Sequence, residues 1–553
     1  MTVSSTKETV YDVAILGSGL AGSMLGAVLA RNGVRVALVD AGQHPKFAIG
    51  ESTIPYTLVA LRTIAERYDV PEIKTLATFT NCTKVIGPSF GIKKNFGFLV
   101  HHEGKKQDPK EVNMFGTPGL LHEASHLYRQ DTDAYLFATA VKYGCTPLQN
   151  TRVDDVEFDD DGVTVHAGDT RIRARYVVDA SGFRSPIADK FDLRENPSRL
   201  KHHSRSLWNH MIGVPRTDDL FDTAPQDTPP TPWYSGTVHH MFERGWFWVI
   251  GFDNHRNSRN PLCSVGLTLD ERRYPKVPGE SPAEEFKRYA AKYPDIERQY
   301  AGAKAMREWV STDRLQYSSK QTIGDRWCLL AHAAGFIDPL FSRGLSNTAE
   351  SINALSWRLI DAVKDGDFSA ERFEYIDRLQ QGLLDYNDAL VNAAFISFAD
   401  YDLWTAVFRI WAWGSNAGTF RLQSAITKFF EDHDDQHFKD IEEADALGLY
   451  WPDHAGFKKL FDEMVTQLDA VDAGTTTPRA AADTLYTMLV EADYVPDHFG
   501  FADRTRRFLS PSRKTLLKTA RWALTKADPD VRSLMLSNGR QAIKYKLRGQ
   551  RIF

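Results

Sequence analysis

Two short hydrophobic segments near the start of the chain are separated by a glycine-rich turn and a helical segment. Residues 13–16 are a continuous apolar run, as expected of a strand that is buried on both faces of a parallel sheet. A helical segment starts near Leu20, and residues 34–39 form a second apolar strand that ends at Asp40. This order of strand, helix and strand predicts a β–α–β unit and an α/β fold.

The middle of the chain shows the alternation that is typical of antiparallel strands. Residues 151–178 read as a hairpin with its turn at Asp161-Gly162, and residues 200–326 are rich in short strands, aromatics and prolines. The clearest strand of this β region is 245–251, and residues 327–330 form another buried strand.

Helical spacing dominates the rest of the chain. Ile352, Leu355, Leu359 and Val363 lie on one face of a long predicted helix that stops at Gly366. The pattern is mainly helical from residue 368 onward. The aromatic segment 395–420 fits a hydrophobic core better than a pocket wall, and in a pocket its rings would stack on a flat substrate.

The glycine-rich turn follows the first strand with the spacing G-x-G-x-x-G. Gly17 permits the tight turn, Gly19 lets a pyrophosphate approach the backbone, and Gly22 lets the helix pack close to the strand. The N–H groups of the helix start, at Leu20 and Ala21, would face the phosphates. Asp40 can accept the ribose hydroxyls, so the motif predicts dinucleotide binding without separating FAD from NAD.

Composition adds limits to this picture. The chain has 553 residues, of which 25% are charged and 42% hydrophobic, as in an ordinary globular protein of two or more domains. No apolar run approaches the length of a membrane span, and residues 1–10 resemble no signal segment, which favours the cytoplasm. The four cysteines are far apart, so we expect reduced thiols and no metal site.

Charge is distributed unevenly along the chain. Residues 504–553 contain 14 Lys/Arg and 2 Asp/Glu, whereas the whole chain has a net charge of −5. We expect this basic tail to pack on an acidic surface of the chain, with residues 431–445 as one candidate, or to dock an acidic partner such as a carrier protein. No nucleic-acid-binding module accompanies the charge, so we do not expect nucleic acid as a partner.

Four stretches together resemble the flavin-dependent halogenases, a branch of the FAD monooxygenase group. They are the glycine motif at Gly17, Gly-Glu-Ser-Thr-Ile-Pro at Gly50, Gly-Trp-Phe-Trp-Val-Ile-Gly at Gly245, and 334–346. The resemblance covers about the first 365 residues and implies FAD as the dinucleotide. It assigns further cofactor contacts to the following residues: Ser52, Thr53, Ile54, Arg129, Asp179, His332, Gly335, Asp338 and Pro339.

The resemblance also implies a domain arrangement. We expect a Rossmann-type FAD-binding domain at 1–199, to which 50–125 add active-site residues, and a mostly β substrate-side region at 200–330. The chain would return to the FAD-binding domain at 331–367 and end in a helical C-terminal domain at 368–553 with the basic tail.

A lysine is the reactive residue that the family implies. Reduced flavin reacts with O2 to give a C4a-hydroperoxide, halide attack on it gives hypohalous acid, and a lysine holds that oxidant by a hydrogen bond or as a haloamine. In the family this lysine stands five residues before a strand phenylalanine. Lys93 stands five before Phe98, and Lys94 remains an alternative.

The other implied site residues surround the flavin. Backbone N–H groups of Ser342, Gly344 and Leu345 would bind the halide, since a residue without Cβ lets an anion approach. Alternate spacing puts Trp246 and Trp248 on one face of a strand, where they would wall the flavin chamber or simply fill the core.

Three positions depart from the family pattern. Gly251 replaces the proline that ends W-x-W-x-I-P, and Ala331-His332 replaces a Gly-Asp pair that touches the flavin ribityl chain. Phe341 replaces the glutamate of the tryptophan halogenases, which favours the phenol, pyrrole or polyketide-type branch and places Phe341 in the pocket wall.

The sequence therefore predicts an enzyme that uses FADH2, O2 and chloride or bromide to halogenate an electron-rich aromatic substrate, free or tethered to a carrier protein. No second dinucleotide motif is present, so a separate flavin reductase would supply FADH2. The alternatives are an FAD-dependent aromatic hydroxylase that consumes NAD(P)H itself and a non-catalytic FAD-binding partner protein.

Overall fold

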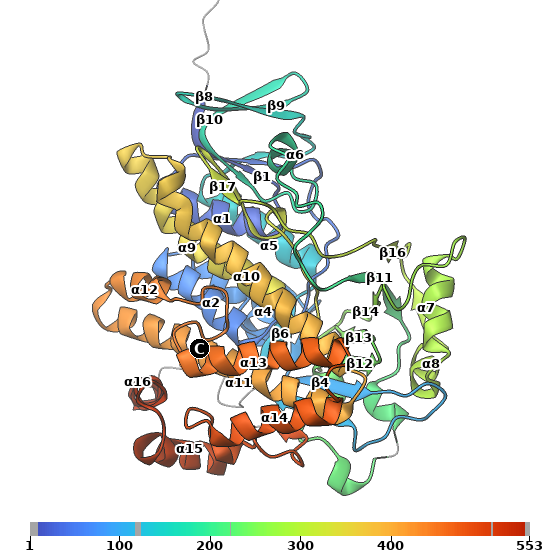
Figure 1. Cartoon of the computed structure of the whole chain (residues 1–553). Coiled ribbons are helices and arrows are strands. Elements are labelled where there is room, and N and C mark those ends of the chain that lie inside the picture. The colour runs from blue at the N-terminus through green and yellow to red at the C-terminus, as the bar shows by residue number, and fades with distance from the viewer. Residues whose placement is uncertain (1–8, 117–122, 222, 510–512, 548–553) are drawn as a thin grey trace, which may run out of the picture.

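The structure is a computed structural model that describes residues 9–116, 123–221, 223–509 and 513–547. Most of residues 1–10, from which we predicted the absence of a signal segment, and the last residues of the basic tail lie outside the described residues. Within the described part the chain builds two large sheets and a layer of helices (Figure 1).

The first sheet contains the β–α–β unit that the hydrophobic pattern predicts. β1 (Val10–Leu16) pairs in parallel with β2 (Val36–Val39) and with β10 (Thr170–Asp179), and α1 (Leu20–Arg31) connects β1 to β2. The sheet is completed by β7 (Thr146–Leu148), β17 (Ile323–Gly324), β18 (Trp327–Leu329) and the antiparallel strands β8 (Asp155–Asp159) and β9 (Gly162–Ala167). The hairpin predicted for 151–178 is therefore present, as β8, β9 and β10.

The return to this sheet comes earlier than the expected boundary at residue 331. β18 pairs in parallel with β10, and β17 pairs with β18, so the chain rejoins the first sheet at Ile323. α5 (Arg129–Tyr143) and α9 (Arg343–Asp365) pack with α1 against the sheet. α9 ends at Gly366, as the spacing predicts.

The second sheet corresponds to the predicted β region but also takes in strands from outside it. Its path runs through β15 (Lys304–Ala305), β11 (Ser204–Ile212), β14 (Cys263–Asp270), β13 (Gly245–Gly251), β12 (Thr237–Phe242), β4 (Asn95–Val100), β5 (Val112–Gly116) and β19 (Phe508–Leu509). β16 (Val310–Ser311) pairs with β11, and β3 (Gly91–Lys93) pairs with β6 (Ala124–His126) in a separate ribbon.

Helices cover both faces of the second sheet. One face packs against α7 (Pro282–Ala290) and α8 (Pro294–Tyr300), two helices that the β interpretation of 200–326 missed. Their sequence signal is the capping box that starts at Ser281, in which Ser281 and Glu284 cap each other's backbone N–H. The other face packs against α10 (Ala370–Ser397) and α11 (Tyr401–Asp432).

The aromatic segment 395–420 is core. Trp404, Phe408, Trp411 and Trp413 of α11 are at most 2% exposed and join side chains of β4, β12 and β13 in one cluster. α6 (Pro186–Lys190) lies against β8 and β18 of the first sheet (Figure 1). The other helices are α2 (Pro55–Arg67), α3 (Pro71–Thr75), α4 (Phe79–Val85), α12 (Gln436–Asp440), α13 (Ala455–Asp472), α14 (Pro478–Glu491), α15 (Arg513–Thr525) and α16 (Pro529–Leu547).

Two arginines at the start of the basic tail pair with acidic residues outside the segment 431–445. Arg504 pairs with Asp483 at 2.5 Å, and Arg507 pairs with Asp227 at 2.6 Å. In the segment 431–445, Asp435 pairs with Arg67 instead. These two arginines therefore pack on the chain's own acidic surface, at places that no local sequence pattern marks.

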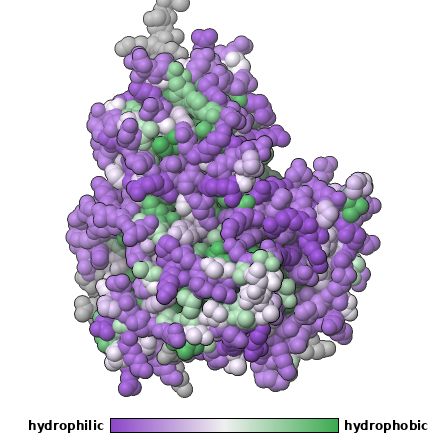
Figure 2. Space-filling view, viewed as in Figure 1, coloured by the Kyte–Doolittle hydropathy of each residue, from purple (hydrophilic) through white to green (hydrophobic). Residues whose placement is uncertain are grey.

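The surface seen in Figure 2 is mostly hydrophilic, with smaller hydrophobic patches between the polar residues. Among the described residues, every helix is too short or too polar to cross a membrane. The four cysteines are buried and free, as expected.

Candidate active site

The turn between β1 and α1 has the geometry that a pyrophosphate needs. Gly17 adopts φ +98°, and a Cβ there would lie 2.6 Å from the Ala180 carbonyl oxygen. A Cβ on Gly22 would lie 1.9 Å from the Gly17 carbonyl oxygen, so only glycine lets the helix approach the turn. A Cβ built on Gly19 would lie 4.0 Å from its nearest neighbour, Asp133 Oδ2. The space above Gly19 is therefore open to a ligand.

The start of α1 is arranged for an anion. Gly19 is the N-cap, no side chain caps the helix, and no acidic residue lies in its first turn. The first N–H groups, at Leu20 and Ala21, are therefore free of side-chain partners, and the helix dipole favours negative charge at this end.

Asp40 stands at the end of β2, where the ribose would lie. Its Oδ2 accepts hydrogen bonds from the Ser18 N–H at 2.6 Å and the Ser18 hydroxyl at 2.7 Å, and it pairs with Lys46. Burial raises the pKa of Asp40, but the bonds from Lys46, Ser18 and Gly42 outweigh it and lower the pKa to about 2. The open turn, the uncapped helix and this ionised carboxylate together fit FAD.

Arg129 ties the nucleotide site to the segment before α2. It opens α5, as expected, and donates to both oxygens of Asp133 at 2.7 and 2.9 Å. Its Nη1 also donates to the carbonyl oxygens of Ile49 and Gly50 at 2.6 and 3.2 Å. The guanidinium thus fixes the backbone immediately before Ser52.

His332 lies beside the start of α9. A Cβ built on Gly344 would be 3.4 Å from His332 Nε2. Desolvation by the surrounding protein, together with the charge of Arg129, lowers the pKa of His332 to about 4 although part of the residue is exposed, so the ring is neutral at pH 7. His332, Gly344 and Arg129, which lie far apart in the sequence, are therefore brought together.

The predicted halide loop enters α9 through a strained residue. Ser342, the N-cap, adopts φ +53°, and no side chain caps the helix or places an acid in its first turn. Ala331 adopts φ +55° in the same region. Two non-glycine residues in left-handed backbone, beside an uncapped helix start, are typical of a ligand site. Leu345 packs on the core below the loop.

Other predicted cofactor contacts have their polar atoms engaged by the protein. The Asp179 carboxylate accepts bonds from Ser181, Ser185 and the Ile187 N–H, so it shapes the loop after β10. Asp338 accepts from the Ser204 hydroxyl at 2.8 Å. The remaining predicted contacts also interact within the protein. Thr53 donates to the Ser125 carbonyl, and the Pro339 carbonyl accepts the Ser342 N–H. Ile54 is the N-cap of α2, and Gly335 packs against Leu384.

The two neighbouring lysines lie in different surroundings. Lys93 is 2% exposed, and its Nζ donates to Ser52 Oγ at 2.5 Å and lies 3.2 Å from the centroid of the Phe96 ring. The Lys94 side chain is 38% exposed and pairs with Glu123 at 3.4 Å. Burial lowers the pKa of Lys93 well below its ordinary value.

Aromatic side chains surround Lys93. His239 stacks against both Phe96 and Phe98, with ring centroids 5.5 and 4.5 Å away. Trp246 and Trp248 lie on this same sheet face, as alternate spacing predicts, and Trp246 contacts His239 at 5.1 Å. Among the described residues, no carboxylate pairs with Lys93.

Phe341 connects the halide loop to the lysine. Its ring centroid lies 4.9 Å from that of Trp411, and Trp411 lies 5.5 Å from Phe96, which covers Lys93. Phe341 is buried among these rings, and its place in the pocket wall stays a prediction. Three aromatic side chains in contact, Phe341, Trp411 and Phe96, therefore link the residue next to Ser342 to the Lys93 amine.

Sequence reasoning missed several polar residues around Lys93. Thr237 bonds to Ser52 and His126, and His126 also bonds to the Gly251 carbonyl. Glu51 pairs with His210 at 2.7 Å, with its second oxygen unpartnered among the described residues. Thr237, His126 and His210 come from separate strands and no local motif marks them, whereas Glu51 stands in the motif at Gly50, which assigned it no role.

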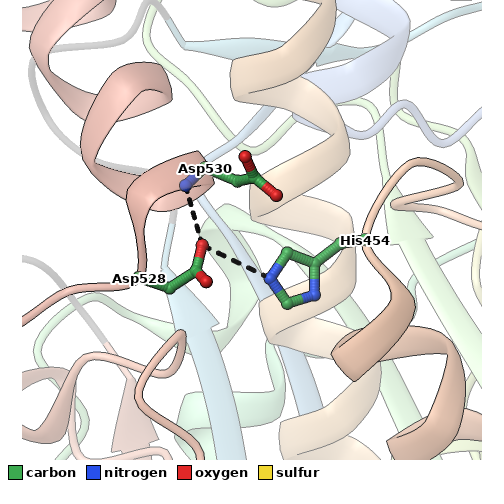
Figure 3. A group of neighbouring side chains, drawn as sticks. All are labelled: His454, Asp528 and Asp530. Carbon is green, nitrogen blue, oxygen red and sulfur yellow. Dashed lines mark hydrogen bonds and ion pairs between the residues drawn. The ribbon is translucent and has the colours of Figure 1, made fainter.

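A group of His454, Asp528 and Asp530 has the spacing of possible metal ligands (Figure 3). His454 Nδ1 accepts the Phe457 N–H, and Asp528 accepts the N–H groups of Asp530 and Val531 at the start of α16. Helix capping and a 3.7 Å ion pair explain the group. It adds no metal site to the prediction.

Comparisons with known proteins agree with this geometry. The FAD binding domain family matches residues 10–264. The tetracycline 7-halogenase of Kitasatospora aureofaciens is 51% identical over 96% of each chain. The monodechloroaminopyrrolnitrin halogenase PrnC of Pseudomonas fluorescens is 44% identical over 94% of this chain and 93% of its own.

More distant likenesses extend the same picture. The 1H-pyrrole-2-carbonyl-[peptidyl-carrier protein] chlorinase of Pseudomonas fluorescens is 26% identical over 66% of this chain and 79% of its own. The crystal structure of the halogenase PltM with phloroglucinol and FAD is 33% identical, covers 91% of this chain and 100% of its own, and superposes with a TM-score of 0.87. The chain therefore belongs to the flavin-dependent halogenases.

Proposed function

We propose that the protein chlorinates or brominates an electron-rich aromatic substrate through a hypohalous species held by Lys93. The supporting observation is the Lys93 amine itself, which is buried beside Ser52 without a carboxylate partner among the described residues. A bound FADH2 would supply the electrons that activate O2, and the residues of this chain would direct the oxidant that results.

The lysine environment suits that role. An unpaired buried amine loses its charge readily, because burial disfavours the ammonium form. A neutral amine can hydrogen-bond hypohalous acid or take its halogen, giving R–NHX and water from R–NH2 and HOX. The exposed, paired Lys94 lacks these features, so we assign the reaction to Lys93.

We expect the halide to bind at the start of α9 and the oxidant to pass along a row of aromatic side chains to Lys93. The uncapped start of α9, at Ser342 and Gly344, would hold chloride or bromide by its N–H groups. From there, the rings of Phe341, Trp411 and Phe96 lead to Lys93 and keep water away from the route.

The substrate would be activated by its own hydroxyl or nitrogen. Phe341 stands where the tryptophan halogenases carry a glutamate, and no carboxylate replaces it at Lys93 among the described residues. We therefore favour a phenol, pyrrole or polyketide-type substrate over tryptophan.

Two partners follow from the same proposal. A separate flavin reductase would supply FADH2. A carrier protein bearing the substrate would dock on the basic helices α15 and α16, where Leu517 and Leu524 are exposed next to Lys518 and Arg521. A carrier-binding assay with a chain truncated after residue 509, which keeps β19, tests this docking.

The central experiment compares two neighbouring variants. Purified protein is supplied with a flavin reductase, NADH, bromide and a panel of phenols, pyrroles and indoles, and products are examined by mass spectrometry for bromine isotope doublets. Lys93→Ala should lower halogenation by at least about 1,000-fold while O2 consumption continues. Lys94→Ala is the matched control and should keep most of the activity.

The alternatives give different results in the same assay. An oxygenated product without a halide requirement, formed when the protein alone consumes NADPH, would indicate an aromatic hydroxylase. Halogenation at the wild-type rate in Lys93→Ala would remove the lysine from the proposal.

A further inference from the structure

A chain of hydrogen bonds runs from Lys93 to the end of β13. Lys93 Nζ lies 2.5 Å from Ser52 Oγ, and Ser52 Oγ lies 2.8 Å from Thr237 Oγ1. Thr237 Oγ1 lies 3.0 Å from His126 Nε2, and His126 Nδ1 lies 3.0 Å from the Gly251 carbonyl oxygen. The four side chains are each at most 8% exposed.

The Gly251 carbonyl, at the end of this series of hydrogen bonds, determines which atom donates in each bond. A carbonyl oxygen can only accept, so His126 must carry a proton on Nδ1 and donate it to Gly251. Burial, with the charge of Lys93 as a smaller cause, lowers the pKa of His126 to about 3, so the ring is neutral and Nε2 has no proton. Nε2 must then accept from the Thr237 hydroxyl.

The remaining bonds follow in sequence. Since Thr237 gives its proton to His126, its oxygen accepts the Ser52 proton. Since Ser52 gives its proton to Thr237, its oxygen accepts an N–H of Lys93. Every hydroxyl proton in the chain therefore points away from the lysine.

This direction leaves the lone pair of a neutral Lys93 amine uncovered. A neutral amine has two N–H groups and one lone pair. One N–H is donated to Ser52, and the face of the Phe96 ring, with its centroid 3.2 Å from Nζ, can accept the second. The third position is left for the lone pair, with which the amine would meet an electrophilic halogen.

We propose that Ser52, Thr237 and His126 are positioning residues that orient the Lys93 amine and keep its lone pair free of hydrogen bonds. The proposal rests on the assignment of Lys93 as the reactive lysine. Without Thr237, Ser52 would have no acceptor in this chain, and its hydroxyl could turn and donate to the lone pair. The oxidant would then compete with an internal hydrogen bond for the same electrons.

The reactivity of the amine can be measured without FAD or halogenation. Isocyanic acid, the neutral form of cyanate, is small and adds to neutral amines, giving R–NH–CO–NH2 from R–NH2 and HNCO. Peptide mass spectrometry of cyanate-treated protein gives the rate at Lys93 relative to surface lysines in the same tube. The ratio cancels the concentration of the reagent.

In the wild type, this ratio should fall as the pH rises from 7 to 9. The neutral fraction of ordinary surface lysines increases about tenfold per pH unit in this range, whereas that of Lys93 increases less, because burial lowers its pKa well below the ordinary value. The titratable groups that face Lys93 are His126 of β6 and His239 of β12, and both have pKa values lowered to about 3 by burial. Neither changes charge between pH 7 and 9.

Two conservative variants of Thr237 test this series of hydrogen bonds. At pH 7, Thr237→Val should lower the Lys93 ratio by about fivefold, the effect of one hydrogen bond on the lone pair. Thr237→Ser keeps the hydroxyl and should restore the ratio to within about twofold. Equal ratios in Thr237→Val and the wild type, or no recovery in Thr237→Ser, would overturn the proposal.

A second pair keeps the test decisive if Thr237→Val does not fold, as judged by circular dichroism. His126→Gln retains a donor for Gly251 and an acceptor for Thr237 and should resemble the wild type, whereas His126→Leu should lower the ratio like Thr237→Val. A normal ratio in His126→Leu would overturn the proposal. A failure of the halogenase assignment appears instead as halogenation that survives Lys93→Ala, so the two failures are distinguishable.

Discussion

The nucleotide-binding sheet and the second sheet differ in the polar groups that they bury. In the first, the carboxylates of Asp12 and Asp40 are paired with Arg35 and Lys46, and both have lowered pKa values despite burial. In the second, the face toward α11 buries His239 and covers the amine of Lys93, which belongs to β3 of the neighbouring ribbon, and burial lowers the pKa values of both groups. Charge is thus stabilised beside the phosphate-binding turn and disfavoured where an oxidant would be held.

The two regions differ because their ionisable groups have different numbers of charged and hydrogen-bonding partners. Asp40 has a cation and three N–H or O–H donors within reach. Lys93 has one hydroxyl and an aromatic ring, so an ammonium there would be poorly compensated. On the opposite face of the second sheet, the buried Arg205 is paired with Glu285, so a buried cation has a carboxylate partner there.

The largest effect, on FAD affinity, is expected from a side chain that fills the space between α1 and the nucleotide-binding turn. Gly22→Ala would place a Cβ 1.9 Å from the Gly17 carbonyl oxygen and force α1 away from β1. We expect FAD affinity to fall by at least about 100-fold, measured by flavin fluorescence titration. Gly302→Ala, where no atom lies within 4 Å of the new Cβ, is the control and should bind FAD like the wild type.

The charged pair on the far face of the second sheet gives the next largest effect. Arg205 is 1% exposed and donates to both oxygens of Glu285 at 2.6 and 3.0 Å, which anchors α7 to β11. Arg205→Met leaves the buried Glu285 carboxylate with only a 3.7 Å ion pair to Arg288 and should lower the free energy of unfolding by about 3 kcal/mol in urea titrations. The double variant with Glu285→Met should recover much of this loss, and no recovery would contradict the explanation.

Acid should affect the second sheet before the first. The folded-state pKa of His239 is about 3, below the ordinary 6.5, so its contribution to stability is complete above pH 6.5 and is lost as the pH falls toward 3. Between pH 6 and 5, His239→Phe should reduce the pH slope of the free energy of unfolding by about 1.4 kcal/mol per pH unit.

Asp40→Asn provides the contrast. The pKa of Asp40 is also lowered, to about 2, so its contribution is present above the unfolded value of 3.8 and is lost only below it. This variant should therefore leave the slope between pH 6 and 5 unchanged. The same slope in wild type and His239→Phe would show that protonation of this ring does not limit stability.

The smallest effect concerns backbone strain beside the flavin site. Ala331 adopts φ +55°, where the family has glycine. Ala331→Gly should raise the free energy of unfolding by about 0.5–1 kcal/mol, since glycine adopts this backbone without strain. Ala333→Gly, two residues on in ordinary backbone, should lower it instead, and melting temperatures of the two variants would check the opposite signs.

These contrasts explain which features could be predicted from the sequence. The turn at Gly17, the acid at Asp40 and the stop at Gly366 act within one or two elements, so spacing alone identifies them. The choice between Lys93 and Lys94 depends on which side chain β3 turns toward Ser52, and neighbouring residues in a strand face opposite ways.

The positioning residues could not be predicted because they meet only through sheet pairing. Thr237 belongs to β12 and His126 to β6, and each is an ordinary strand residue in its own neighbourhood. Likewise, the contact between Phe341 and Trp411 depends on how α11 crosses the sheet. Long-range packing carries no local signal of spacing or composition.

The short strand β19 has a consequence for biosynthesis. β5 forms its outer hydrogen bonds with Phe508–Leu509, so one margin of the second sheet stays open until the ribosome has added residues almost 400 positions later. During translation the nascent chain therefore presents an unprotected strand for most of its synthesis. Chaperone supply and slow expression should then influence the yield of this protein more than the strength of any single contact in its finished form.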